Sequence, residues 1–77
     1  MKAYVLLSIR TGDVSQVLSL LTKVDSVKEA HMTFGPYDAV VVLEATDVHA
    51  MGKIISNEIQ PIPGILETLT CLAVNLN

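Results

Sequence analysis

Aromatic residues are scarce in this sequence, which has no tryptophan, two tyrosines and one phenylalanine among 77 residues. Hydrophobic residues nevertheless make up 51% of the chain, so the core must be built mainly from aliphatic side chains. A chain of this length forms a single domain, residues 1–77, near the size at which one core is only just sufficient. So much aliphatic surface exceeds what one small layer covers, and we therefore expect a homo-oligomer.

Cysteine and long apolar runs are scarce as well. Cys71 is the single cysteine, which excludes an internal disulfide. No basic-then-apolar signal segment opens the chain, and no apolar run approaches the roughly 18 residues of a membrane span. These features predict a soluble cytoplasmic protein.

Basic residues are few and scattered. Five Lys and Arg stand against eight Asp and Glu, which gives a formal net charge of −3. Nucleic acids and anionic membranes are bound mainly through clustered cations. We therefore expect no direct contact with nucleic acid and none with a membrane.

Residues for catalysis or metal binding form no recognisable pattern. His31 and His49 are the two imidazoles, and no His or Cys pair has the spacing of metal ligands. No nucleophile signature is present, and the four glycines are too far apart to cradle a phosphate. The sequence predicts no catalytic residue, no metal and no cofactor.

Hydrophobic periodicity is the strongest positive signal. Apolar residues alternate in segments 2–9, 27–34 and 65–76, as in strands, whereas segment 39–43 is apolar on both faces like a covered central strand. The order predicts an α+β, ferredoxin-like βαββαβ fold, with two helices on one face of an antiparallel four-stranded sheet and the first and third strands in its centre. The apolar stripes of the two predicted helices are Val14, Val17, Leu18, Leu21 and Val48, Met51, Ile55, Ile59.

Local signals mark the ends of these helices. Asp13 with Gln16 predicts a capping box, and Asp47 predicts the N-cap of the second helix. Gly52 costs about 1 kcal/mol relative to Ala inside a helix, so we expect it to mark a close approach to the sheet or to another chain. Residues 61–64, Pro-Ile-Pro-Gly, end the helix and form the linker to the last strand.

The segment Gly35-Pro36-Tyr37-Asp38 joins the second strand to the central one. Gly35 permits a positive φ, Pro36 fixes its own φ and Asp38 can bond the local backbone, so the segment predicts a tight hairpin turn. A phenol and a carboxylate on a loop held by a rigid sheet also suit ligand binding. Turn chemistry alone is the simpler of these two interpretations.

Two threonines, Thr68 and Thr70, lie on one face of the last predicted strand among Leu and Val. They are typical strand residues, but such placed hydroxyls also orient small ligands in apolar sites. Asp38 would accept an ammonium group, and backbone N–H groups around Gly35 would donate to a carboxylate. The set therefore matches an α-amino acid.

The order of three motifs carries a resemblance to a known family. Phe34–Asp38 precedes an aliphatic strand and an Asp-capped helix, and Ile62–Ile65 and Glu67–Thr70 follow, reading Ile-Pro-Gly-Ile and Glu-Thr-Leu-Thr. This arrangement resembles the C-terminal effector-binding module, the RAM domain, of Lrp/AsnC transcriptional regulators. The resemblance implies dimerisation through the sheets (a dimeric α+β barrel), rings of dimers such as an octamer, and amino-acid effectors bound between dimers.

The resemblance also implies which residues form the site. Gly35, Tyr37 and Asp38 would shape the effector pocket, and Thr68 and Thr70 would line it. Full-length members carry a helix-turn-helix domain before this module, whereas the first predicted strand here begins almost at the first residue. We therefore expect a stand-alone module that acts through partners, such as full-length Lrp/AsnC regulators, without binding DNA itself.

Two alternatives of other classes stay open at this point. One is a small dimeric α+β-barrel enzyme, a cofactor-independent monooxygenase or an isomerase, with Tyr4, His31 and Asp38 as acid and base. The other is an oligomerisation scaffold without a ligand.

Overall fold

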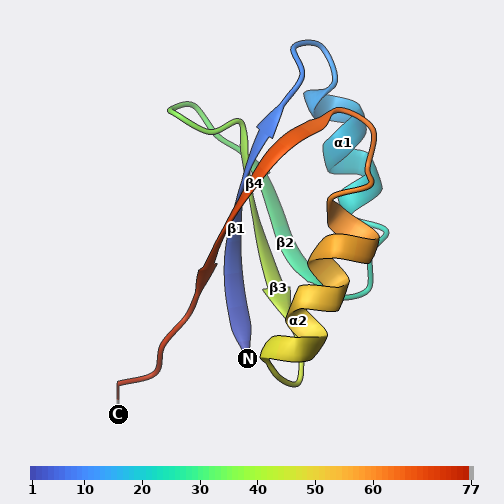
Figure 1. Ribbon diagram of the computed structural model, residues 1–77. Helices are drawn as coiled ribbons and strands as arrows, with labels where there is room; N and C mark the ends of the chain where they lie inside the picture. The colour runs from blue at the N-terminus through green and yellow to red at the C-terminus, as the bar shows by residue number, and fades with distance from the viewer. Residues whose placement is uncertain (77) are drawn as a thin grey trace.

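The computed structural model describes residues 1–76 as a four-stranded antiparallel sheet with both helices against one face (Figure 1). The strand order β2-β3-β1-β4 places the first and third strands in the centre, which confirms the predicted ferredoxin-like βαββαβ fold. Within these residues no helix is long and apolar enough to cross a membrane. The elements are β1 (Lys2–Ile9), α1 (Val14–Leu21), β2 (Val27–Met32), β3 (Ala39–Glu44), α2 (Val48–Ile54), a π-helical turn η1 (Ile55–Ile59) and β4 (Ile65–Leu72).

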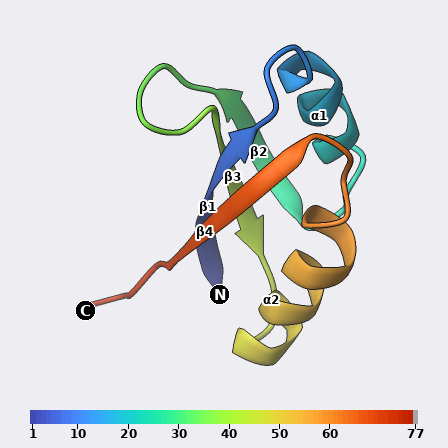
Figure 2. The ribbon, with the colours of Figure 1, turned by 45° about the horizontal axis from the view of Figure 1, so that its top comes forward.

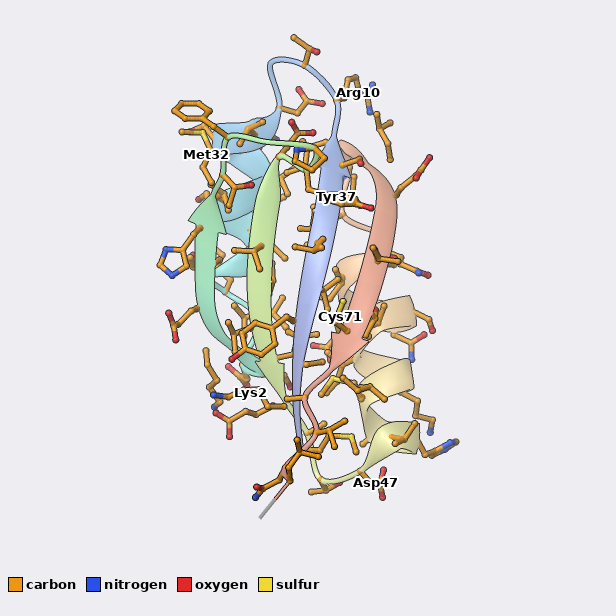
Figure 3. All side chains as sticks on the ribbon, turned by 90° about the vertical axis from the view of Figure 1, so that its left-hand side faces the viewer. Lys2, Arg10, Met32, Tyr37, Asp47 and Cys71 are labelled. Carbon is orange, nitrogen blue, oxygen red and sulfur yellow. The ribbon has the colours of Figure 1, made fainter. Side chains whose placement is uncertain are left out.

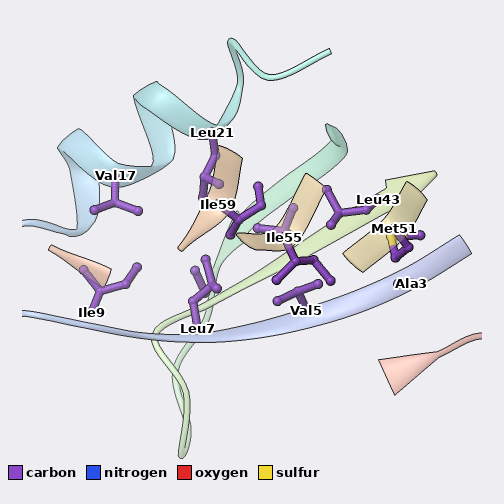
Figure 4. Packing of buried hydrophobic residues seen from close by; sticks show 12 residues of the cluster. Ala3, Val5, Leu7, Ile9, Val17, Leu21, Leu43, Met51, Ile55 and Ile59 are labelled. Atoms are coloured by element: carbon purple, nitrogen blue, oxygen red, sulfur yellow. The ribbon is translucent and has the colours of Figure 1, made fainter. Parts of the chain in front are cut away.

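The hydrophobic core lies between the sheet and the helices (Figures 2 and 4). Alternate side chains of a strand point to opposite faces, and in β1 the residues Ala3, Val5 and Leu7 are completely buried on the helix side. The predicted helical stripes supply the other half of the core, except that Val48 is 56% exposed. The buried residues contributed by the helices and η1 are Val17, Leu21, Met51, Ile55 and Ile59.

The turn η1 is wider than the α-helix that the sequence predicts. The backbone N–H of Gln60 donates to the carbonyl of Ile55, five residues back, at 2.8 Å. Met51, Ile55 and Ile59, predicted as part of one apolar stripe, are all buried across this change from α-helix to π-type turn.

The local helix predictions have different outcomes: Asp47 and Asp13 both stand at the N-cap position, but only Asp47 makes the expected cap hydrogen bond, and Gly52 does not contact the sheet. The Asp47 side chain accepts a hydrogen bond from the N–H of Ala50 at 2.8 Å, as expected of an N-cap. Asp13 makes no such cap bond, because its carboxylate contacts Arg10 at 3.2 Å instead. Gly52 is exposed and a Cβ there would meet nothing within 4 Å, so it marks no close approach to the sheet.

Gly64 is the tightest point of the linker that leads into β4. Its φ is +102°, and a Cβ at this position would lie 3.0 Å from side-chain atoms of both Asp13 and Val17. Its carbonyl accepts a hydrogen bond from the N–H of Arg10 at 2.8 Å. The linker is therefore fixed to the end of β1 and to the start of α1 at a residue without a side chain.

The other face of the sheet, which we call the open face, has an apolar centre (Figure 3). Directly opposite residues of antiparallel strands project to the same face, so strand pairing assigns two rows of residues to it. Leu69 and Tyr4 are 46% and 42% exposed there, because both helices lie on the opposite side. The two rows are Val40–Leu6–Leu69 and Val42–Tyr4–Cys71.

Candidate functional site

The loop between β2 and β3 is longer than the tight turn expected from its sequence, because it spans residues 33–38. The N–H of Thr33 donates to the carbonyl of Asp38 at 3.0 Å, and the Thr33 hydroxyl donates to the carbonyl of Tyr37 at 2.8 Å. Gly35 has a φ of +149°, in the positive range that its sequence position predicted. The loop is thus held closed by hydrogen bonds of its own.

An apolar hollow of about 320 Å³, which we call the loop hollow, lies between this loop and Leu6 of the open face. Two of the predicted ligand residues, Gly35 and Tyr37, line it, and Tyr37 lies near the upper end of β1 (Figure 3). Phe34 also lines it and is 98% exposed. The loop hollow therefore presents apolar surface rather than charged groups.

Asp38, the third predicted residue of this loop, is engaged with the backbone of β1. Its Oδ2 accepts a hydrogen bond from the N–H of Ile9 at 2.7 Å, and its own N–H donates to the carbonyl of Leu7 at 2.8 Å. The register of β1 against β4 shifts between Ser8 and Ile9. The carboxylate therefore acts as a hydrogen-bond partner for β1 at this irregularity, which is a structural role.

Replacing Asp38 by Ala is expected to destabilise the domain by about 1–3 kcal/mol, because a partly buried N–H loses a charged acceptor. In a domain of this size each kcal/mol corresponds to roughly 4–8 °C in Tm. Asp38→Asn keeps an acceptor oxygen and should lose less than half as much. Thermal denaturation of the two variants checks this, and equal melting of both variants and the wild type would contradict the structural role.

The predicted threonines lie on the other face of the sheet. Thr68 is opposite Leu7 and Thr70 is opposite Val5, and both of those β1 residues are buried under the helices. Thr68 and Thr70 therefore project to the helix side, whereas the loop hollow lies on the open face. One chain does not bring the two threonines together with the predicted loop residues.

A second hollow of about 330 Å³, the edge hollow, lies between the end of η1 and the start of β4. The side-chain Nε2 of Gln60 donates to the Thr68 hydroxyl oxygen at 3.1 Å across it. Gln60 was not among the residues predicted from the sequence, because the π-type turn that precedes it was not predicted. The edge hollow is lined by Gln60, Ile65, Leu66, Glu67 and Thr68.

The remaining titratable side chains do not gather into a further site. The nearest pair is His31 and Glu29 on β2, whose Nε2 and Oε1 atoms are 3.0 Å apart with both side chains 61% exposed. Over the described residues, no group of three His, Cys, Asp or Glu side chains is placed to hold a metal ion. Cys71 is a free, exposed thiol on the open face.

The chain thus has a ferredoxin-like sheet with two small hollows at its margins. The chain belongs to the family of the Lrp/AsnC ligand binding domain, whose model matches residues 2–75. The family expected from the sequence motifs is thereby confirmed.

Individual relatives agree with this assignment. The chain is 30% identical over 59 residues to the HTH-type transcriptional regulator Ptr1 of Methanocaldococcus jannaschii, covering 77% of this chain and 40% of Ptr1. The crystal structure of FFRP-DM1 has a TM-score of 0.90 at 29% identity, covering 95% of this chain and 97% of that chain. The transcriptional regulator NMB0573 of Neisseria meningitidis, solved as an L-Met complex, shares the fold. Its TM-score is 0.87 at 17% identity, covering 97% of this chain and 50% of that one.

Proposed function

We propose that this chain is an amino-acid-binding and oligomerisation module that modulates transcription or amino-acid metabolism in the cytoplasm through its partners. In this role it catalyses no reaction and does not contact DNA itself. The match of residues 2–75 to a ligand binding domain carries the proposal. Ptr1 is named a transcriptional regulator and NMB0573 was solved with L-Met, which supports a regulatory setting and an amino-acid effector.

The open face supports the oligomeric part of the proposal. Its two rows of paired residues are apolar, and the helices leave them uncovered. A second copy placed face to face would remove this apolar surface from water, which favours association. Dimers of this kind would assemble further into rings such as an octamer, and full-length Lrp/AsnC regulators are the proposed protein partners.

The predicted effector residues form two halves in this arrangement. Gly35 and Tyr37 line the loop hollow, and Asp38 shapes that half by fixing the loop to β1. Thr68 lines the edge hollow, with Thr70 on the same side of β4. We propose that halves from different copies meet where dimers contact one another, so that assembly completes each effector site.

A dye-based thermal shift of the wild-type protein against each of the common L-amino acids at millimolar concentration tests the proposed function. An amino acid at about 100 times its Kd stabilises the folded state by about 2.7 kcal/mol. The expected result is a rise in Tm of roughly 10–20 °C for one or two amino acids, and less if a whole ring melts as a unit. A flat response across the panel would contradict amino-acid binding.

A further inference from the structure

The last described residues, 73–76, form an apolar segment, which we call the tail, that leaves the sheet after β4. The N–H of Ala73 donates to the carbonyl of Lys2 at 2.9 Å, and the chain then runs on beyond the end of the sheet (Figure 1). Val74 and Leu76 are 76% and 91% exposed. They are two residues apart, so an extended tail presents both side chains on one side. The tail therefore carries apolar surface that its own domain does not cover.

The loop hollow is a second uncovered apolar surface. It is lined by Leu6 and residues 33–37, none of which has a charged side chain, and the Thr33 hydroxyl already donates to the carbonyl of Tyr37. Its volume is about 320 Å³, whereas an apolar cavity of about 150 Å³ is sufficient to hold a benzene molecule. The loop hollow therefore has room for two aliphatic side chains, and no charged group there would lose its hydration.

A chain cannot fill the loop hollow with its own tail, because the two lie at opposite ends of the sheet. β4 runs antiparallel to β1, from Ile65 opposite Ile9 to Leu72 opposite Ala3. The tail therefore begins at the Ala3 end and continues away from the sheet. The loop lies at the other end, where Asp38 bonds the N–H of Ile9. A tail that enters this hollow must come from a second copy.

A second copy on the open face would bring the two surfaces together. The tail and the loop both project on the side of the sheet that faces away from the helices (Figures 1 and 2). A two-fold axis between the facing sheets, running across the strands, places the tail of each copy beside the loop of the other, as in a self-complementary interface. Facing sheets lie about 10 Å apart and four extended residues span about 13 Å, so the tail is long enough to cross.

We propose that each copy inserts Val74 and Leu76 into the loop hollow of its partner, so that two equivalent contacts hold the dimer at its ends. This inference rests on the oligomeric part of the proposed function and names the residues that secure it. Neither the tail nor residues 33–37 carry a charged side chain, so the contact buries no unpaired charge. It also gives a role to Phe34, whose exposed ring lines the hollow and would be covered in the dimer.

Sedimentation of the wild type and of the combined variant Val74→Ser, Leu76→Ser over a range of concentrations tests the proposal. The variant is expected to raise the dimer Kd about 100-fold, because a truncated apolar contact costs about tenfold and is lost at both ends of the dimer. Both side chains are exposed in the single chain, so the fold should be kept, and circular dichroism verifies this. Val48→Ser, an exposed valine on α2, is the matched control and should leave Kd within about twofold.

A double-mutant cycle with Phe34→Ser tests whether the tail and the loop touch. Phe34→Ser alone is expected to weaken the dimer, and adding it to the tail variant should raise Kd by less than about threefold more, because both changes remove the same contact. If the effects of the loop change and the tail change multiply, the two segments do not meet and the proposal is overturned.

A disulfide cross-link provides a direct test of the contact. Leu76→Cys is combined with Phe34→Cys in a Cys71→Ser background, which removes the native thiol. Mild oxidation is expected to give covalent dimers on a non-reducing gel, whereas each single-cysteine protein should remain mostly uncross-linked. A dimer that forms no cross-link, or that keeps the wild-type Kd in the tail variant, would overturn this inference and leave the open-face dimer intact. A wild type that stays as single chains would overturn both proposals.

Discussion

Gly64→Ala should lower the Tm of this domain by 10 °C or more. A residue with a Cβ at φ +102° is strained by roughly 1–2 kcal/mol, and the new Cβ would lie 3.0 Å from side-chain atoms of Asp13 and Val17. Overpacking of this kind costs typically another 1–3 kcal/mol. Folded domains are stable by only about 5–15 kcal/mol, and a chain this short lies near the lower end, so the loss is a large share of the total.

Gly52→Ala is the matched control for that substitution. Gly52 lies inside α2 without a positive φ, and a Cβ there meets nothing within 4 Å. The change is therefore expected to stabilise the helix by about 1 kcal/mol and raise Tm by roughly 4–8 °C. Thermal denaturation of the two variants side by side measures opposite shifts. Melting of Gly64→Ala at the wild-type temperature would contradict the described linker.

Leu6→Glu is expected to convert the protein to single chains at micromolar concentration. Leu6 lies in the middle of an open-face row, between Val40 and Leu69, where a face-to-face partner would exclude water. A carboxylate buried there without a cation costs several kcal/mol, which corresponds to a rise of about 100-fold or more in the dimer Kd. Analytical ultracentrifugation measures the mass of the assembly directly.

The control for this experiment is Val48→Glu. Val48 is 56% exposed in the first turn of α2, away from the open face, and an acidic residue suits the N-terminal end of a helix. This variant should keep the wild-type assembly. If Leu6→Glu folds, as judged by circular dichroism, and also keeps the wild-type mass, the open face is not the contact between copies.

Most of the fold was predictable because periodicity and burial agree along β1 and α1. Alternation in the first strand predicted that Ala3, Val5 and Leu7 face the core, and the doubly apolar third strand predicted a central position. The wide turn η1 was not predicted, because propensity and periodicity rules assume the α-helical repeat.

The arrangement of the candidate site was less accessible to sequence reasoning. Thr68 projects to the helix side because it pairs with Leu7. The sequence alone does not determine this strand register. The bond from Ile9 to Asp38 joins residues 29 positions apart, so the structural role of that carboxylate required the folded chain. The sequence motifs were sufficient to predict the family. The side of the sheet on which each motif residue lies could be assigned only from the pairing of the strands in the structure.

Native mass spectrometry of the wild-type chain with its best-stabilising amino acid tests the central claim most directly, because mass counts both chains and bound ligands. The expected spectrum shows assemblies with an even number of chains that carry up to one amino acid per chain. A protein that stays as single chains at micromolar concentration and carries no amino acid would contradict the account of an oligomeric effector-binding module.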